Sequence, residues 1–200
     1  MSVPGIPIES TSMTIVLASA SPRRQELLRA AGIAFTVQPA DIYETPLAGE
    51  AARECAERLA REKALFVARD RPEEWILGAD TIVVVDDVIL GKPRDTDDAL
   101  RMLRMLSGKN HEVITGVCLV APAGGEIVTG SETTLVTMCG ISDDEIHEYV
   151  ATGEPMDKAG AYAIQGIASR WIPRIEGDYG NVVGLPVALV YRMLRGRGAL

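Results

Sequence analysis

Short β-rich runs alternate with helical segments along the whole chain, and this alternation limits the fold more than any other feature. The first β-rich run, residues 14–18, leads into a segment of helix formers, residues 23–31, that ends at Gly32. A short strand is expected at residues 35–38. Apolar residues at helical spacing then predict a long helix over residues 50–68.

The middle of the chain contains two patterns typical of β-hairpins. In residues 75–93, two β-rich runs are separated by Asp86 and Asp87, which suit a tight turn. Residues 111–121 and 126–138 are longer β-rich runs, joined by a segment rich in proline and glycine. Each pair predicts neighbouring antiparallel strands.

Further helices follow each hairpin. Residues 95–106 have helical spacing, and Ser142 with Glu145 three residues later forms a capping-box pattern that opens a helix ending near Val150. A final helix is expected over residues 182–195. Strands and helices in this order predict an α/β (mixed α+β) domain built on a twisted mixed sheet.

Residues 1–200 are expected to form one domain, because no internal repeat, low-complexity tract or linker interrupts the pattern. Residues 1–13 are expected to be a loose N-terminal extension, and Met13 is a candidate alternative start. This segment has no basic leader, and no apolar run in the chain approaches the ~20 residues that span a bilayer. No membrane association is therefore expected.

Charge and cysteine content narrow the class of protein. The formal net charge of −8 disfavours binding to a nucleic acid polymer, which needs a broad basic surface. An anionic substrate must therefore meet a local cluster of cations. Cys55, Cys118 and Cys139 are odd in number and include no CxxC pair, which predicts neither a disulfide framework nor a zinc site. A cytoplasmic location is expected.

The sequence SASPRR, residues 19–24, places two arginines in the first turn of the first expected helix, with Ser21 as its N-cap and Pro22 in the first turn. Helix N-termini offer unpaired amides and a positive dipole end, which suit a phosphate. Arg23 and Arg24 oppose that dipole unless an anion compensates. The alternative is a capped surface helix with solvated arginines, and the residues alone leave both open.

Asp80 interrupts an otherwise apolar strand that reads WILGADTIVVV. A carboxylate there costs free energy unless it binds a metal, pairs with a cation or ends the buried part of the strand, and a metal-binding or catalytic role is favoured. Lys92, between Gly91 and Pro93, and Lys63 on the long helix are candidate phosphate contacts. Solvated lysines fit the same patterns.

Residues 154–166, EPMDKAGAYAIQG, combine small residues with polar ones. Small residues let the backbone approach a ligand, and the amide of Gln165 offers a donor and an acceptor to a base edge. Tight core packing is an equally open alternative. The chain has no GxxxxGK[ST] or GxGxxG phosphate loop. His111 and His147 have no nucleophile motif nearby, so both are expected to be structural.

A set of motifs follows in order along the chain: SASPRRQELL, the REKA segment, GADTIV, GKP, LSG with His111, and GEPMDKAGAYAIQG through NVVGLP. In this order they resemble the Maf, or septum-formation, family along nearly the whole chain. The resemblance implies an elongated mixed sheet flanked by helices, related in architecture to the inosine triphosphate pyrophosphatases. It also implies a homodimer, and hydrolysis of nucleoside triphosphates between the α and β phosphates with a divalent metal, Mg²⁺ or Mn²⁺.

By the same resemblance, Asp80 matches the family's proton acceptor, and Glu44 matches an acidic position that shares the metal with it. The positions that match phosphate-side residues are Ser19, Arg23, Arg24, Lys63 and Lys92. The combination suits a triphosphate with its cation, which needs converging positive charges and a carboxylate that orients metal and water.

Three positions distinguish subgroups of the family, and here they are Arg23, Thr81 and Gln165. They resemble the group that acts on dTTP and UTP, whereas the 7-methyl-GTP group has an aromatic residue, a glutamine and a glutamate there. An amide suits the mixed edge of uracil or thymine, and a carboxylate suits a cationic purine. Modified pyrimidine nucleotides such as pseudo-UTP or 5-methyl-UTP, and a housecleaning role, fit the same interpretation.

Two other functions stay open at this level. One is a nucleotide-binding regulator of cell division whose hydrolysis is incidental, because binding and catalytic residues coincide. The other keeps the enzyme but changes the substrate to a purine. Turnover measurements, and exchange of Gln165 for glutamate, distinguish them.

Overall fold

The computed structural model describes residues 14–200, so the expected N-terminal extension and Met13 lie outside the described residues. The strands are β1 (Ile15–Leu17), β2 (Phe35–Val37), β3 (Ile76–Val85), β4 (Val88–Leu90), β5 (Asn110–Val120), β6 (Ile127–Thr137) and β7 (Arg174–Glu176). The α-helices are α1 (Pro22–Ala30), α2 (Ala52–Ala68), α3 (Thr96–Leu106), α4 (Asp143–Ala151), α5 (Tyr179–Val183) and α6 (Val187–Arg195). Short 3-10 turns are η1 (Pro122–Gly124), η2 (Glu154–Asp157), η3 (Ala159–Ala161) and η4 (Ile167–Trp171).

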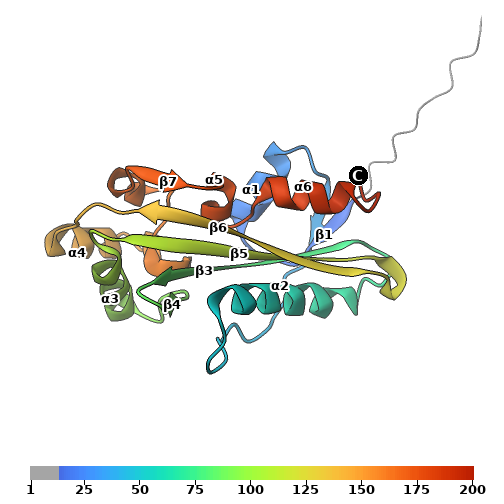
Figure 1. Cartoon of the computed structure of the whole chain (residues 1–200), viewed down its shortest axis with the longest axis horizontal. Helices are drawn as coiled ribbons and strands as arrows, with labels where there is room; N and C mark the ends of the chain where they lie inside the picture. Colours follow the sequence, from blue (N-terminus) through green and yellow to red (C-terminus); the bar gives the residue numbers. More distant parts are fainter. Residues whose placement is uncertain (1–13) are drawn as a thin grey trace, which may run out of the picture.

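A mixed seven-stranded sheet forms the centre of the molecule, in the order β2-β1-β3-β5-β6-β7, with β4 added to β3. β1 pairs in parallel with both β2 and β3, because α1 and α2 provide the crossovers that parallel strands need. β5 pairs antiparallel with both β3 and β6, and these three long strands extend the sheet (Figure 1). The expected elongated mixed sheet flanked by helices is confirmed.

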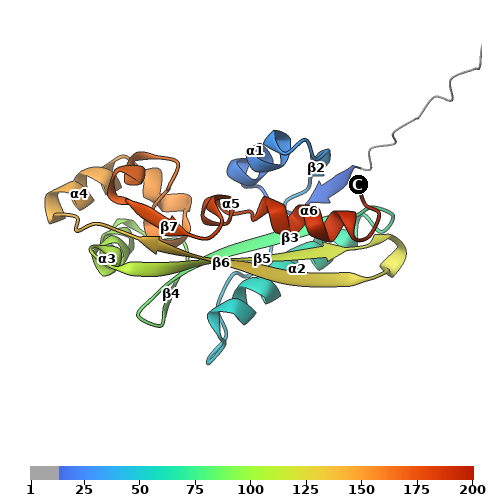
Figure 2. The same cartoon turned by 45° about the horizontal axis from the view of Figure 1, so that its top comes forward.

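Helix α2 covers one face of the sheet, while α1 and α6 lie over the other (Figures 1 and 2). Two sheet glycines allow α2 to approach closely. A Cβ on Gly78 would lie 2.1 Å from the carbonyl oxygen of Ala60, and one on Gly116 would lie 2.2 Å from that of Ala56. Any side chain at these two positions would push α2, and the residues it carries, away from β3 and β5.

Helices α3 and α4 pack together at the end of the sheet that carries β7 (Figure 2). Apolar side chains of these two helices, among them Leu103 and Tyr149, belong to one buried cluster together with Trp171 from η4. Ser142 and Glu145 form the capping box expected at the start of α4, with each side chain bonded to the other's backbone N–H. Helix α4 is therefore anchored at both its apolar face and its N-terminus.

The structure agrees with some of the turns and helix ends expected from the sequence and differs from others. The turn at Asp86 and Asp87 is confirmed, and both residues have positive φ, 48° and 61°, as a tight hairpin turn requires. The helix expected over residues 182–195 is wrong: it is two helices, because Gly184 has a φ of 127° and Pro186 has no backbone N–H. Ser21 is the N-cap of α1, but its side chain makes no capping hydrogen bond.

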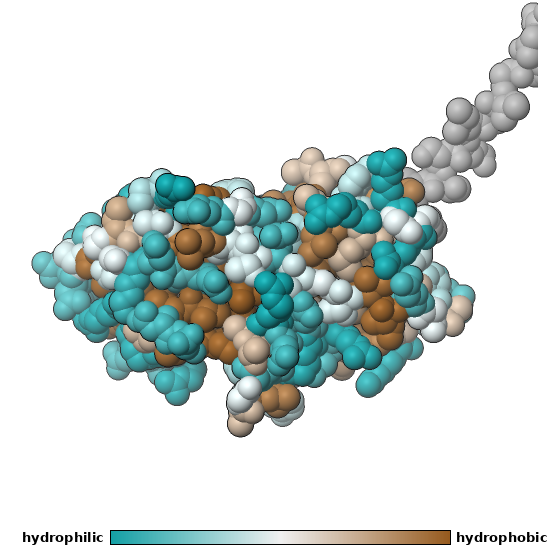
Figure 3. Space-filling model, in the orientation of Figure 1, coloured by the Kyte–Doolittle hydropathy of each residue, from teal (hydrophilic) through white to brown (hydrophobic). Residues whose placement is uncertain are grey.

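The face seen in Figure 3 is mainly hydrophilic, with apolar side chains gathered in a patch left of centre. Within residues 14–200, no helix combines the length and the apolar character that crossing a bilayer demands. Cys55 and Cys118 are buried and Cys139 is exposed, and all three are free cysteines.

Candidate functional site

A cleft of about 760 Å³ brings together residues that lie far apart in the sequence. It is lined by the N-terminus of α1, the middle of α2 and β3, the segment after β4, and residues from η2 to the segment before η4. Every site residue expected from the sequence lines it: Ser19, Arg23, Arg24, Glu44, Lys63, Asp80, Thr81, Lys92 and Gln165. These residues therefore converge on one space, while their individual roles stay predictions.

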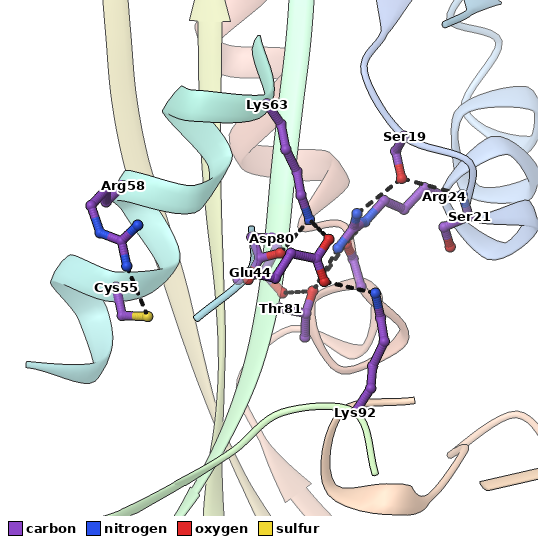
Figure 4. A network of polar contacts seen from close by, with 12 residues as sticks. Ser19, Ser21, Arg24, Glu44, Cys55, Arg58, Lys63, Asp80, Thr81 and Lys92 are labelled. Atoms are coloured by element: carbon purple, nitrogen blue, oxygen red, sulfur yellow. Dashed lines mark hydrogen bonds and ion pairs between the residues drawn. The ribbon is translucent and has the colours of Figure 1, made fainter. Parts of the chain in front are cut away.

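Asp80 lies in the middle of β3 and is met by a lysine from α2 (Figure 4). The Nζ of Lys63 is 2.5 Å from Oδ1 of Asp80 and 2.6 Å from Oε1 of Glu44. Asp80 and Lys63 are each only 6% exposed, so neither charge is well hydrated. Their ion pair offsets the free-energy cost of burying both, and it rules out the alternative of a solvated Lys63.

Glu44 connects Lys63 and Lys92, two of the three lysines that line the cleft. It comes from the irregular segment between β2 and α2, and its Oε2 lies 2.8 Å from the Nζ of Lys92. Burial by itself raises the pKa of Glu44, but the charges and hydrogen bonds of Lys63 and Lys92 outweigh burial and lower the pKa to about 2. The carboxylate is therefore ionised at neutral pH.

The carboxylates of Asp80 and Glu44 both approach one point, the ammonium of Lys63. Mg²⁺ is usually bound through one or two carboxylates together with waters and substrate phosphates, and seldom through a full cage of protein ligands. Among residues 14–200, no group of three or more His, Cys, Asp or Glu side chains is placed to hold a metal ion. The carboxylate pair therefore fits a cation that is shared with an anionic substrate.

Arg24 is a buried cation at the wall of the cleft. Its Nε donates to the carbonyl of Gly184 at 2.8 Å, Nη1 to the hydroxyl of Ser19 at 3.0 Å and Nη2 to the hydroxyl of Thr81 at 3.1 Å. All three partners are uncharged. Burial lowers the pKa of Arg24, and the nearby charges of Asp80 and Glu44 offset this only in part. An anion in the cleft would lower the cost of burying this guanidinium.

Arg23 contacts a different part of the cleft from its neighbour. Its Nη1 lies 3.1 Å from Oδ2 of Asp157, whose other oxygen is 2.5 Å from the Nζ of Lys158. Consecutive helical residues point about 100° apart, which explains why the two arginines separate. The structure thus joins α1 to the segment that starts at Glu154, a link with no local sequence signal.

A chain of hydroxyl groups behind Arg24 was missed by the sequence analysis. The Oγ1 of Thr81 lies 2.9 Å from that of Thr115, which donates to the carbonyl of Asn181 at 3.0 Å. Because an arginine only donates and the proton of Thr115 is used, the proton of Thr81 has two acceptors, the hydroxyl of Thr115 at 2.9 Å and the more distant carbonyl of Gly184 at 3.4 Å. Asn181 is fully buried and its amide nitrogen donates to the carbonyl of Val113. Polar residues within apolar β5 were the only available signal.

The remaining lining of the cleft is mostly uncharged, and part of it comes from residues 159–165. Gln165 is exposed there, whereas Tyr162 is buried and places its hydroxyl 2.8 Å from Nε2 of His111. The segment therefore combines the two alternatives, core packing and a place in the cleft, because Tyr162 packs in the core and Gln165 faces the cleft. Such a lining suits an uncharged heterocycle held by a few polar groups.

Comparison with known proteins adds to this geometry. Residues 14–197 match the family described as Maf-like protein. A dTTP/UTP pyrophosphatase from Koribacter versatilis is 60% identical over 188 residues, which cover 94% of this chain and 96% of that protein. Proteins of the same name from Syntrophomonas wolfei and Geobacter metallireducens are each 54% identical, covering 91% and 93% of this chain and 96% and 97% of their own.

A solved structure supports the fold alone. The Staphylococcus aureus Ham1 protein aligns with a TM-score of 0.50 and 16% sequence identity, over 92% of this chain and 98% of that chain.

Proposed function

This chain belongs to the family of Maf-like proteins, and on that basis we propose that it is a nucleoside triphosphate pyrophosphatase. It hydrolyses the bond between the α and β phosphates of dTTP, UTP and modified pyrimidine nucleotides, releasing the monophosphate and pyrophosphate. Near full-length identity of 54–60% to three dTTP/UTP pyrophosphatases supports this. The observation that carries the proposal is the convergence of Arg24, Lys63 and Lys92 around Asp80 in one cleft.

The phosphate chain is bound by cations and by the start of α1. Lys63, Lys92 and the two arginines supply positive charge for an ion that carries several negative charges. The N-terminus of α1 adds unpaired amides and its dipole. The hydroxyl of Ser19 accepts from Arg24 and from the N–H of Ser21, so its own proton stays available for a phosphate oxygen.

Asp80 accepts the proton of the attacking water. A general base has to lie within hydrogen-bond reach of that water, and the side chain of Asp80 lines the cleft among the phosphate-side cations. Lys63 holds one carboxylate oxygen, Oδ1, which orients the group and leaves the other oxygen for water. The developing charge on the phosphates meets cations that are already in place, which lowers the barrier.

A divalent metal, Mg²⁺ or Mn²⁺, completes the proposal. Asp80 and Glu44 would hold it together with the substrate's phosphates, and it would supply positive charge that polarises the phosphoryl oxygens. A triphosphate also competes with Glu44 for Lys63 and Lys92, since each lysine can pair with either anion. Substrate binding therefore frees the carboxylate of Glu44 for the metal.

The nucleobase is recognised in the uncharged part of the cleft. Gln165 is exposed there and offers one acceptor and two donors, which match the alternating groups on the edge of uracil and thymine. Thr81 and Arg23, the other two subgroup positions, line the same cleft. This matches the pyrimidine substrates named for the relatives. Removal of non-standard pyrimidine nucleotides is the corresponding cellular role.

The test is a panel of dTTP, UTP, CTP, GTP and 7-methyl-GTP, each incubated with the purified protein and Mg²⁺ or Mn²⁺. Pyrophosphate and the monophosphate are expected from dTTP and UTP. Release of orthophosphate alone would show that the bond assignment is wrong, and preference for 7-methyl-GTP would overturn the pyrimidine assignment. Tight nucleotide binding with negligible turnover would favour a regulatory binding protein.

A homodimer and a cytoplasmic location belong to the same proposal, through the family likeness. Light scattering after size-exclusion chromatography measures the molar mass. A value near 21.4 kDa would contradict the dimer.

A further inference from the structure

We infer that Tyr149 and Glu154 position the turn that carries Gln165, and thereby help to set affinity for the nucleobase without contacting the nucleotide. The inference rests on the proposed function, because it takes Gln165 as the residue that meets the base. Both residues lie behind the turn, outside the set of side chains that line the cleft. They act as positioning residues.

Tyr149 is held firmly at the end of α4. It is 1% exposed, and its ring packs edge-on against Trp171 with the ring centroids 5.3 Å apart. Its hydroxyl accepts from the backbone N–H of Ala163 at 3.2 Å and donates to Oε1 of Glu154 at 2.8 Å. Burial, and then the Glu154 carboxylate, raise the pKa of Tyr149, so the hydroxyl keeps the proton that it donates.

Glu154 binds the other end of the same turn. The backbone N–H of Ile167 lies 3.1 Å from Oε1 and 3.3 Å from Oε2 of its carboxylate. Between the two anchored ends, the N–H of Gly166 donates to the carbonyl of Ala163 at 3.1 Å and closes the turn. The N–H groups two residues before and two residues after Gln165 are therefore both bound from behind.

The glycine in this turn has a packing reason. A Cβ on Gly166 would lie 2.2 Å from Oε1 and 2.6 Å from Oε2 of Glu154, far inside van der Waals contact. The absence of a side chain at residue 166 thus allows the carboxylate to reach the backbone. Glu154 and Gly166, the first and last residues of the EPMDKAGAYAIQG segment, are explained by one contact.

The physical consequence concerns binding of the base more than chemistry. The side chain of Gln165 is exposed in the cleft, so its direction depends on the backbone of its turn. If an anchor is removed, the turn has more conformations and binding must order it, which weakens affinity. Only ligands that contain the base should be affected, because the phosphate-side cations come from other elements.

The experiment compares Tyr149→Phe, which keeps the ring and removes the hydroxyl, with the wild type. Calorimetry measures Kd for UMP and for inorganic tripolyphosphate, each with Mg²⁺, and steady-state kinetics gives kcat and KM for UTP. We expect Kd for UMP and KM for UTP to rise about five- to tenfold, since both hydrogen bonds of the Tyr149 hydroxyl are lost. The kcat value and the Kd for tripolyphosphate should change by less than about twofold. Tyr191→Phe, which removes an exposed hydroxyl on α6, is the matched control.

A second pair of variants keeps the test decisive if Tyr149→Phe does not fold. Glu154→Gln retains one acceptor oxygen and should raise KM for UTP by less than about threefold, whereas Glu154→Ala loses both contacts and should raise it about tenfold. Glu148→Gln removes an exposed carboxylate from α4 and controls for net charge. The inference is supported if Kd for UMP rises more in Glu154→Ala than in Glu154→Gln while Kd for tripolyphosphate stays unchanged in both.

Two results would overturn it. Unchanged UMP affinity in Tyr149→Phe and Glu154→Ala would show that the anchors do not matter for the base. Equal weakening of UMP and tripolyphosphate would show a general structural effect. Failure of the proposed function has a different signature, because the wild type itself would then release no pyrophosphate from UTP, while the two binding measurements still decide the role of the anchors.

Discussion

The Nη2 of Arg24 lies 3.1 Å from the hydroxyl oxygen of Thr81, so a position predicted to separate family subgroups contacts a buried arginine. The hydroxyl of Thr81 continues to Thr115 and from there to Asn181. We therefore expect Thr81 to act on the substrate indirectly, by holding the guanidinium that forms part of the cleft wall.

Thr81→Val should lower kcat/KM for UTP about tenfold, because Arg24 loses an acceptor and Thr115 loses its donor. Thr81→Ser keeps the hydroxyl and should stay within about threefold of the wild type. Steady-state kinetics on the two variants measures the difference. Full activity in the valine variant would mean that the chain of hydroxyl groups does not orient Arg24.

Asp80→Asn should lower kcat at least a hundredfold, on the order expected for loss of a general base, while the fold is kept. Lys63 retains its ion pair with Glu44, so no buried cation is left without a partner. Circular dichroism and thermal unfolding check the fold, and pyrophosphate release checks turnover. Asp86→Asn, at the exposed hairpin turn, is the control. Retained turnover in Asp80→Asn would remove this residue from the mechanism.

Glu44→Gln should raise the Mg²⁺ concentration for half-maximal activity about tenfold, because one of two carboxylates is lost. At saturating Mg²⁺, the loss of activity should be smaller. Metal titrations of UTP hydrolysis test this, with Glu54→Gln on the exposed side of α2 as the control for charge. An unchanged Mg²⁺ dependence would place Glu44 outside the metal site.

Gln165→Glu should lower kcat/KM for UTP about a hundredfold and narrow or reverse the preference over 7-methyl-GTP. A carboxylate cannot donate to the base edge, and it attracts a cationic purine instead. Parallel assays with both nucleotides measure the ratio. If the ratio stays at the wild-type value, the base lies elsewhere in the cleft.

His111 should make stability depend on pH between about 4 and 6.5. Burial lowers the pKa of His111 to about 4, whereas an unfolded histidine titrates near 6.5, so the unfolded state binds a proton first. The contribution of neutral His111 to the free energy of unfolding is fully present above about pH 6.5. It is lost as pH falls to about 4, and the loss amounts to at most about 3 kcal/mol. Urea unfolding at pH 4.5 and 7 should show a smaller difference for His111→Gln than for the wild type.

The low pKa of Glu44 affects stability in a lower pH range than the pKa of His111 does. Its ion pairs stabilise the fold above about pH 4.5, and this stabilisation is lost only as pH falls toward about 2. The two groups can therefore be distinguished by the pH range alone. An equal pH dependence in His111→Gln and wild type would contradict the assignment to His111.

Local interactions made much of the secondary structure predictable. The Asp86 and Asp87 turn and the capping box of Ser142 and Glu145 depend on residues within three positions of one another, so the sequence pattern shows them directly. The expected helix over residues 182–195 failed although signals were present. Gly184 and Pro186 lie inside it, and they outweighed the apolar spacing.

Contacts across long sequence separations were not predictable in this way. The hydroxyl of Thr115 and the amide of Asn181 support Arg24, and Glu154 supports the turn of Gln165, but none of these residues stands out by local pattern. Family resemblance pointed to residues that face the cleft. It gave no role to the side chains behind them, because their role is defined only by their neighbours in space.

The sequence by itself determined the order of strands and helices as far as α4, the family, and the set of polar residues available for chemistry. Only the tertiary structure decided that Lys63 meets Asp80, and that Arg23 and Arg24 bind different partners. Helical and strand periodicity arise from contacts within a few residues, so they can be read along the chain. The charge balance of a buried site depends on which distant segments the sheet brings together, and that is a property of the packed molecule.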